Sequence, residues 1–425
     1  MNRPRQLEQP QQQQRAKQRA LCIAALPQGN DDLSELGELL RTSGVAVAGE
    51  LVQHMEQPHA NTYLGPGKVE EVKQAAKECD ANLVVSDDEL SPRQERNLEE
   101  AVGLPVIDRT AVILDIFAAH AASAEGKLQV ELAQLEYNLA RMRGLWSHLE
   151  RLGGGIGTRG PGESQIETDR RLARDRIASL RRRLRQVGGT RAVMRAERER
   201  AALPTIALAG YTNAGKSTLL NALTGAEVGV GDRLFHTLDP STRTWRLAGR
   251  PYLLTDTVGF IRKLPHQLVD AFGATLEETR RADLLLHVLD AAAPEEQSQT
   301  MRRSVESVLE EIGAGETPRL LVLNKVDLLD AQQRSELRLR HPAALQVSGT
   351  SGEGLEDLGE RIEREFRRTL CPVDLLVPYA NGANLAELHE VAGDVNRQDT
   401  PEGVRVRALV PARLAARFAR FAVAS

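Results

Sequence analysis

The segment with the clearest chemistry follows an apolar run at 205–209 and reads Gly210-Tyr211-Thr212-Asn213-Ala214-Gly215-Lys216-Ser217. Its glycines allow backbone N–H groups to turn toward a ligand, and the expected helix from Thr218 onward adds positive partial charge at its N-terminus. The Lys216 ammonium can then reach the β- and γ-phosphates, while the Ser217 hydroxyl can ligate Mg²⁺. The segment predicts a site for a nucleoside triphosphate and Mg²⁺.

Three further motifs each follow an apolar run, in the order Asp256-Thr257-Val258-Gly259, Asn324-Lys325-Val326-Asp327 and Ser348-Gly349-Thr350. Asp256 can hold Mg²⁺ through water, and the Gly259 N–H can contact the γ-phosphate. The Asp327 carboxylate can accept two N–H bonds from guanine, a pair that adenine lacks, so the site should select GTP. Backbone N–H groups after Ser348 can face guanine O6, although a simple turn is the alternative there. Together the motifs predict GTP hydrolysis.

The loop between the first two motifs contains Phe235-His236-Thr237-Leu238-Asp239. We expect it to contact the nucleotide, with Thr237 completing the Mg²⁺ shell and Thr242 as the alternative. Lys216, Thr237 and Gly259 form the expected catalytic set. Phe260 occupies the position where many GTPases carry a glutamine that orients water, so hydrolysis should depend on a partner or a loop rearrangement. His236 can orient water, but a solvent-facing histidine is the more ordinary interpretation.

A leucine stripe at 128–152 and a second apolar stripe at 173–187 predict two long antiparallel helices joined by a glycine-rich tip at 153–163. Between Arg141 and Pro204 the sequence has 16 Arg, no Lys and 7 acidic residues, a local charge of +9. We expect Arg159, Arg170 and Arg171 to contact RNA. The alternatives are a solvated face with an i,i+4 Glu167–Arg171 pair, a tip without a partner, or a second phosphate cradle.

The remaining sequence predicts an α/β multidomain protein. We expect a disordered leader at 1–20, an N-terminal α/β domain with a parallel sheet at 21–125, the hairpin at 126–201, a P-loop GTPase domain at 202–370 with helices on both faces of a mostly parallel sheet, and a small α+β appendage at 371–425. No run of 18 apolar residues and no secretory signal occur, and the three cysteines fit no metal spacing. A cytoplasmic protein, at most peripherally membrane-associated, is expected.

The chain resembles the HflX family of ribosome-associated GTPases over about residues 20–370. Outside the GTP motifs the resemblance rests on residues 63–68, 107–110, 114–118, 128–135, 153–163 and 167–171. It implies a monomer that binds the large ribosomal subunit rather than DNA, brings its hairpin tip near the peptidyl transferase centre, and separates stalled or idle ribosomes. It also implies that Ser217 and Thr237 ligate Mg²⁺ and that Asn324 and Asp327 recognise guanine. His120 and Gly349 depart from the family pattern.

Two other functions remain open on the residues alone. One is a signalling GTPase that binds a protein effector through its N-terminal domain. The other is an RNA-remodelling NTPase that uses this domain, although the domain has no nucleotide motif of its own. Charge reversal of Arg159, Arg170 and Arg171 should leave partner binding intact if the first is right, and ATP turnover that survives Lys216→Ala would favour the second.

Overall fold

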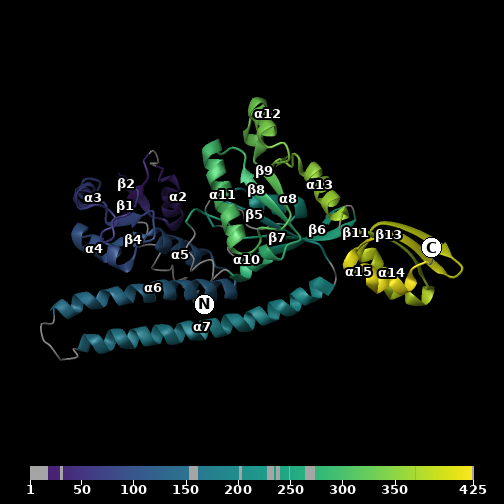
Figure 1. Cartoon of the computed structure of the whole chain (residues 1–425), viewed down its shortest axis with the longest axis horizontal. Coiled ribbons are helices and arrows are strands. Elements are labelled where there is room, and N and C mark those ends of the chain that lie inside the picture. Colours follow the sequence, from purple (N-terminus) through teal and green to yellow (C-terminus); the bar gives the residue numbers. More distant parts are fainter. Residues whose placement is uncertain are drawn as a thin grey trace, which may run out of the picture. The chain divides into compact units, whose positions relative to one another are not determined.

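A computed structural model describes residues 18–28, 32–152, 161–200, 203–226, 234–235, 240–247, 249–263, 273–368 and 370–423 (Figure 1). The chain divides into two compact units. The N-terminal unit comprises residues 1–185, 232–238 and 263–272, and the C-terminal unit comprises residues 186–231, 239–262 and 273–425. Among the described residues no helix is long and apolar enough to cross a membrane.

The N-terminal unit is built on a four-stranded parallel sheet of order β2-β1-β3-β4. Its central strand β1 is buried along nearly its whole length, as expected where helices cover both faces. The strands are β1 (Arg19–Leu26), β2 (Ala46–His54), β3 (Leu83–Ser86) and β4 (Val106–Asp108).

Four helices accompany this sheet: α2 (Ser34–Ser43), α3 (Pro66–Glu78), α4 (Pro92–Val102) and α5 (Arg109–His120). Ser91 begins α4 with a reciprocal capping box that involves Gln94. The Asp108 carboxylate caps α5 by accepting a hydrogen bond from the Ala111 N–H. Helix α5 thus begins directly at the carboxyl end of β4.

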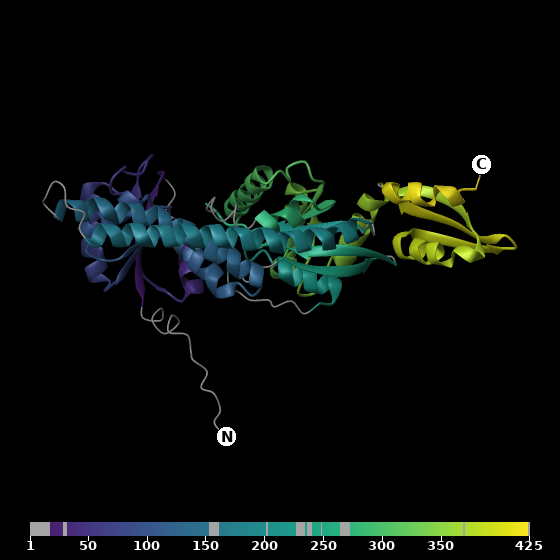
Figure 2. The same ribbon diagram turned by 90° about the horizontal axis from the view of Figure 1, so that it is seen from below.

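The predicted hairpin consists of α6 (Ala124–Leu152) and α7 (Pro161–Arg200), which run side by side in both ribbon views (Figures 1 and 2). The helices meet through apolar side chains that include Leu128, Leu132, Ile177 and Leu180. Ion pairs of 2.6 Å between Arg176 and Glu131 and of 2.7 Å between Arg181 and Glu136 flank this seam. The predicted tip at 153–163 lies outside the described residues up to position 160, and α7 begins at Pro161.

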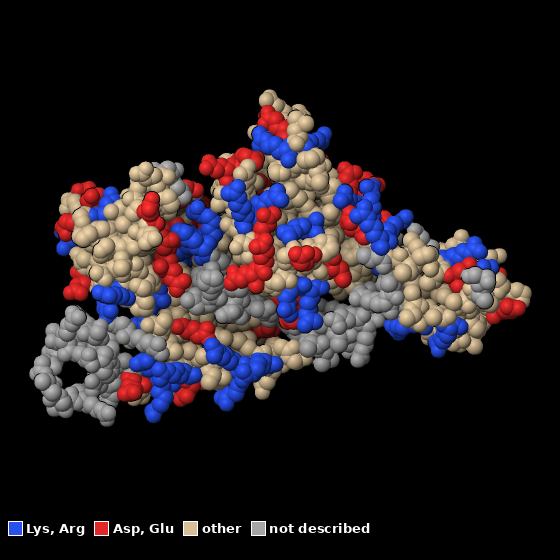
Figure 3. All heavy atoms as spheres, viewed as in Figure 1, with Lys and Arg blue, Asp and Glu red and all other residues tan. Residues whose placement is uncertain are grey.

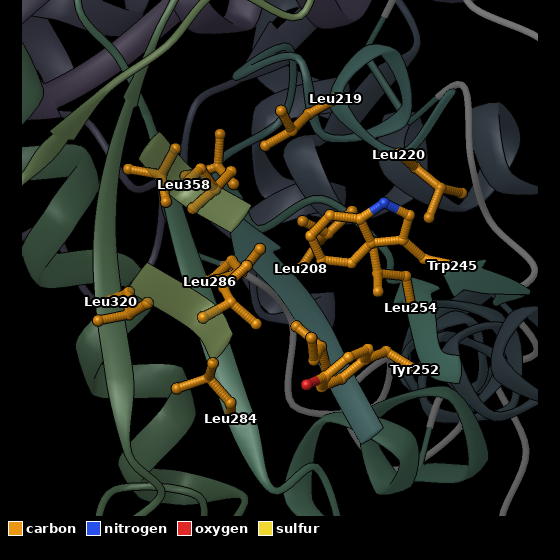
Figure 4. Close-up of a cluster of buried hydrophobic side chains, with 14 of the residues drawn as sticks. Leu208, Leu219, Leu220, Trp245, Tyr252, Leu254, Leu284, Leu286, Leu320 and Leu358 are labelled. Atoms are coloured by element: carbon orange, nitrogen blue, oxygen red, sulfur yellow. The ribbon is translucent and has the colours of Figure 1, made fainter. Parts of the chain in front are cut away.

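The C-terminal unit contains a six-stranded sheet of order β10-β9-β8-β5-β7-β6, parallel except for β6. Figure 4 shows part of its core, where Leu208, Leu254 and Leu286 of neighbouring strands lie close to Trp245 and Tyr252. The strands are β5 (Thr205–Gly210), β6 (Ser241–Leu247), β7 (Arg250–Asp256), β8 (Leu284–Asp290), β9 (Arg319–Asn324) and β10 (Leu345–Gln346).

Helices accompany these strands in the alternating order that a parallel sheet requires. They are α8 (Lys216–Thr224), α10 (Gly273–Arg280), α11 (Glu295–Glu311), the short 3₁₀ helix η1 (Val326–Leu328), α12 (Ala331–Arg340) and α13 (Leu355–Arg367). The motif residues 210–217, 256–259, 324–327 and 348–350 all follow the carboxyl ends of strands in this sheet. In doubly wound folds, ligands bind at this edge.

The chain ends in a three-stranded antiparallel sheet of order β11-β13-β12. Val404, Val406 and Val410 of β13 are buried with Leu388 and Phe418 of its helices. The elements are β11 (Leu370–Val377), η2 (Tyr379–Asn381), α14 (Gly382–Val391), β12 (Gly393–Thr400), β13 (Gly403–Pro411), α15 (Ala412–Phe418) and η3 (Ala419–Phe421). The predicted fold class is confirmed, including this small α+β part.

Candidate active site

The phosphate loop connects the buried strand β5 to α8, as the sequence predicts. Gly215 has a φ of +84° and stands directly before the helix. A Cβ atom at this position would lie 2.3 Å from Nδ2 of Asn324, so only glycine fits both the backbone angle and the space. Tyr211, Thr212 and Ala214 are buried, and Asn213 is exposed with a φ of +60°.

Lys216 lies at the base of this loop and is 6% exposed. Its Nζ donates hydrogen bonds to the carbonyl oxygens of Gly210 (3.0 Å) and Tyr211 (2.8 Å). Burial lowers the pKa of Lys216 to about 8, although the charge of Asp256 opposes this shift. A phosphate group beside Lys216 would add negative charge and favour the protonated amine.

Ser217 and Asp256 bring two oxygen donors together. Ser217 Oγ donates a 2.6 Å hydrogen bond to Asp256 Oδ2, and Asp256 is fully buried at the end of β7. Hydroxyl and carboxylate oxygens suit Mg²⁺, which takes few protein ligands and completes its shell with water and phosphate oxygens. These two residues therefore fit a magnesium site next to the phosphate loop.

Gly259 packs closely against the phosphate loop. A Cβ atom there would lie 2.7 Å from Thr212 Cγ2 and 2.9 Å from Thr212 Cα. The next residue, Phe260, is 1% exposed, and its backbone forms a parallel bridge with Tyr211. The Phe260 N–H donates to Gly210 O, and Phe260 O accepts from the Thr212 N–H. The Phe260 side chain therefore lies in the core and cannot orient a water molecule.

Asn324 connects the phosphate loop with the loop that begins at Ser348. Its Nδ2 donates to Ala214 O over 2.9 Å, and its Oδ1 accepts from the Gly349 N–H over 3.0 Å. Lys325 adopts a φ of +68° and forms a 2.7 Å ion pair with Asp290 at the end of β8. One short motif thus fixes three neighbouring loops at the same edge of the sheet.

Asp327 and the loop at 348–350 form the expected guanine end of the site. Asp327 is exposed, and the described residues offer its carboxylate no hydrogen-bond or ion-pair partner. Ser348 is buried, and its Oγ accepts hydrogen bonds from the N–H groups of Thr350 (3.3 Å) and Ser351 (3.0 Å). Asn324 and Val326 are buried, whereas Lys325 is partly exposed and Asp327 is exposed to solvent.

The other predicted residues lie elsewhere or outside the described chain. Phe235 belongs to the N-terminal unit and is buried there. Residues 236–239, which include His236, Thr237, Leu238 and Asp239, and the tip arginine Arg159 lie outside the described residues. Thr218 is partly buried in the first turn of α8. Thr257 is buried and donates from Oγ1 to Leu208 O over 2.7 Å, and Val258 is buried beside it in sequence.

Arg170 and Arg171 lie on α7, where Arg171 is exposed and Arg170 is partly buried. The ion pair expected between Glu167 and Arg171 is not formed. Figure 3 shows Lys and Arg side chains along the described part of α7. Arg174, Arg182 and Arg185, which the sequence analysis does not single out, are also exposed on α7 and lie at helical intervals from Arg171.

Comparison with known proteins identifies the parts of the chain. Residues 30–118 match the family described as GTP-binding GTPase N-terminal, residues 120–198 match GTP-binding GTPase Middle Region, and residues 205–325 match 50S ribosome-binding GTPase. A solved GTP-binding protein from the archaeon Sulfolobus solfataricus, in complex with GDP, is 26% identical, with 82% of this chain and 98% of that chain covered and a TM-score of 0.41.

Two curated relatives extend the match over nearly the full length. GTPase HflX of Caldanaerobacter subterraneus subsp. tengcongensis is 46% identical, with 96% of this chain and 95% of the relative covered. GTPase HflX of Escherichia coli K12 is 44% identical, with 89% of each chain covered. At these identities over nearly the full length of both sequences, the chain belongs to the HflX family of GTPases.

Proposed function

We propose that this GTPase hydrolyses GTP with Mg²⁺ and acts in the cytoplasm as a monomer. We further propose that RNA of the large ribosomal subunit, near the peptidyl transferase centre, stimulates hydrolysis, and that the cycle promotes dissociation of stalled or idle ribosomes. Ser217 and Thr237 would ligate Mg²⁺, and Asp327 would accept the guanine N–H groups. Because Phe260 cannot orient water, the partner must order the site.

The observation that carries the ribosomal role is an arginine face on α7, formed by Arg171, Arg174, Arg182 and Arg185. At about 100° per residue these four side chains lie within about 80° of one another around the helix. All four are exposed, and the described residues provide no ion pair or hydrogen bond to any of them. Arg176 and Arg181, in contrast, form ion pairs with Glu131 and Glu136 of α6.

Such a face suits a phosphate backbone. One guanidinium group can donate two parallel hydrogen bonds to the oxygens of a phosphate. An arginine that forms no ion pair within the protein can bind a phosphate without first breaking an existing interaction. The apolar contacts of α6 and α7 hold the face on a rigid support. Arg159, Arg170 and Arg171 would contact RNA as well, closer in sequence to the glycine-rich tip.

Steady-state GTP turnover with and without purified large ribosomal subunits tests the function. We expect strong stimulation of the natural chain and nearly none for Arg174→Glu with Arg182→Glu, while turnover without subunits stays unchanged. The control carries Arg303→Glu and Arg338→Glu, an equal charge change at exposed arginines that also lack ion pairs in the described part of the chain. Equal loss of stimulation in both double variants would contradict a role for the arginine face.

The salt dependence of subunit binding gives a second readout. Removing one arginine that binds a phosphate lowers the slope of log affinity against log salt by about 0.7 to 0.9. Arg174→Ala with Arg182→Ala should therefore reduce the slope by about 1.5. A protein effector as the true partner would leave this slope unchanged.

A further inference from the structure

A groove lies between the two helices of the hairpin. It has a volume of about 450 Å³ and is lined by seven described residues of α6 and α7, all in the part of the hairpin that belongs to the N-terminal unit. This volume falls within the range of about 300–1,000 Å³ that is typical of small-molecule sites. The groove is therefore large enough for a planar ring system that carries a sugar.

The floor of the groove is apolar. It is formed by Leu139 of α6 and Ile177 of α7, which also belong to the apolar seam that joins the two helices. Ala140 and Ala178 line the groove beside them, and both are exposed. Because alanine has no side chain beyond Cβ, solvent reaches the flanks of the leucine and the isoleucine at this level of the hairpin.

One helical turn away, the same edge of the seam is covered. Glu136 of α6 and Arg181 of α7, which also line the groove, form an ion pair of 2.7 Å across the two helices. Ala140 follows Glu136 by four positions, and Ala178 precedes Arg181 by three, so the alanines occupy the equivalent positions one turn along. The ion pair thus closes one end of the groove, and the alanines leave the rest open.

The mouth of the groove lies within the arginine face. At about 100° per residue, Ala178 is within about 40° of Arg171, Arg174, Arg182 and Arg185 around α7, and Arg174 itself lines the groove. The described residues provide no ion pair or hydrogen bond to these four arginines. An anionic group beside the groove therefore meets guanidinium groups that need not break an existing interaction to bind it.

We propose that the groove receives one unstacked base of the RNA that the arginine face binds. The apolar floor covers the base, and Arg174 binds the phosphate next to it. Every base has a flat face that can pack in this way, so the site tolerates different sequences. A paired base would first have to leave its helix, which costs free energy, so the hairpin selects unpaired RNA. The inference rests on the proposed RNA-binding role of the arginine face.

The test compares two probes of about ten nucleotides with the full chain. One is oligoadenylate, and the other is a ribose-phosphate strand of equal length that lacks the bases. Both carry the same phosphates and release the same counterions, so a difference in affinity reports the bases. The natural chain should bind oligoadenylate about tenfold more tightly than the base-free strand.

Ala178→Leu fills the groove from an exposed helical position and leaves every arginine in place. It should bind both strands equally, with the affinity for the base-free strand unchanged. Ala178→Ser keeps the residue small, and Asn138→Leu adds the same side chain at an exposed position of α6 that does not line the groove. Both control variants should keep the preference for oligoadenylate.

The dependence on salt separates the groove from the arginines. On large ribosomal subunits, Ala178→Leu should weaken binding by the same factor at every salt concentration, because no phosphate contact is lost. Arg174→Ala with Arg182→Ala should instead weaken the binding of both strands and lower the salt slope.

The outcomes distinguish the groove from the RNA role on which it rests. Equal binding of both strands by the natural chain, weakened in the arginine double variant, would overturn the base site and support the arginine face. A natural chain that binds neither strand would overturn both. A preference for oligoadenylate that persists in Ala178→Leu would also overturn the base site. Self-association of the natural chain that Ala178→Leu abolishes would do the same, by assigning the groove to a second copy.

Discussion

The hydroxyl oxygen of Ser217 lies 2.6 Å from Oδ2 of Asp256, which joins the first turn of α8 to the carboxyl end of β7. Residues 39 positions apart in sequence therefore supply two hard oxygen atoms at one point beside Lys216. A magnesium ion can take a lone pair of the Ser217 oxygen while the Ser217 O–H still donates to Asp256, because a hydroxyl has one donor and two acceptor sites.

Ser217→Ala should therefore remove the gain in nucleotide affinity that Mg²⁺ provides. We expect the GDP affinity of Ser217→Ala in EDTA to stay near that of the natural chain. The factor by which Mg²⁺ raises the GDP affinity should fall at least about tenfold. Fluorescent-GDP titrations with and without Mg²⁺ measure both values. Ser217→Thr keeps a hydroxyl and serves as the control, and full Mg²⁺ dependence in Ser217→Ala would show that this oxygen is not a ligand.

Gly259→Ala should stop hydrolysis while sparing GDP binding. The new methyl group would meet the Thr212 backbone at 2.9 Å, so the segment must shift away from the phosphate loop. Loss of one backbone donor to the γ-phosphate lowers the rate by about a hundredfold or more. Single-turnover GTP hydrolysis and GDP titration measure the two effects. Gly382→Ala, at a helical position with open space, is a control expected to be silent.

Asp327→Asn should change the preferred base from guanine to xanthine. The carboxylate accepts two N–H bonds, whereas an amide also donates one, which suits the second carbonyl oxygen of xanthine. We expect GTP affinity to fall about a hundredfold and XTP affinity to rise. Competition titrations give both numbers. Asp330→Asn is the matched control, since asparagine also caps helices such as α12 well.

Nucleotide binding should take up a proton at alkaline pH. The pKa of Lys216 is lowered from 10.5 to about 8, so at about pH 9 much of the unliganded folded protein carries the neutral amine. Phosphate raises this pKa, and binding then draws a proton from the buffer. Calorimetry in two buffers of different ionisation enthalpy should show uptake at about pH 9 and almost none near pH 7. Equal heats in both buffers at the alkaline pH would contradict this account.

The same shift has a consequence for stability. The unfolded chain binds the extra proton between about pH 8 and 10.5, so the unliganded folded state gains stability as pH rises through that window. Below about pH 8 both states are protonated and the destabilising effect of Lys216 is constant. Bound nucleotide should flatten this dependence.

His287 of β8 should make the GTPase domain sensitive to acid. It is 1% exposed, its Nε2 has no hydrogen-bond partner in the described residues, and burial lowers its pKa from 6.5 to about 4. The unfolded chain therefore binds the proton first, and stability falls as pH drops from about 6.5 to 4, by at most about 3 kcal/mol.

Trp245, in the core of the same sheet, reports this unfolding in a Trp146→Phe background. His287→Leu should remove much of the acid dependence in urea titrations at about pH 7 and about pH 5. His389→Leu, at an exposed position in α14, should leave it intact. Equal acid sensitivity in all three chains would assign the effect to other groups.

Sequence was sufficient where the local pattern decides the structure. The apolar run before Gly210 forms β5, and the residues that follow buried strands meet at one edge, because parallel strands end together. Strand β12, by contrast, has almost no apolar residues and owes its form to pairing with β13. The antiparallel strand β6 is not predicted from the sequence for a similar reason, because most of its residues are polar and only Trp245 is buried.

The contacts that depend on distant residues are also beyond sequence reasoning. Lys263 and Asp87 are 176 positions apart, and nothing in either neighbourhood marks the other. The sequence places Phe235 at the nucleotide because it precedes Thr237, but its side chain is buried on Phe117. Asn324 reaches the phosphate loop only because Gly215 has no side chain in its way. The spacing of these residues in the sequence does not predict this contact.

The double hydrogen bond of Asn324 has a thermodynamic consequence for the ligand. Its Nδ2 donates to the phosphate loop, and its Oδ1 accepts from the loop at 348–350, which we expect to face the base. Ordering either loop by part of the ligand therefore lowers the entropy cost of ordering the other. Guanosine and pyrophosphate, offered together as separate fragments, should therefore bind cooperatively, because each orders a loop that is held by one end of the same amide.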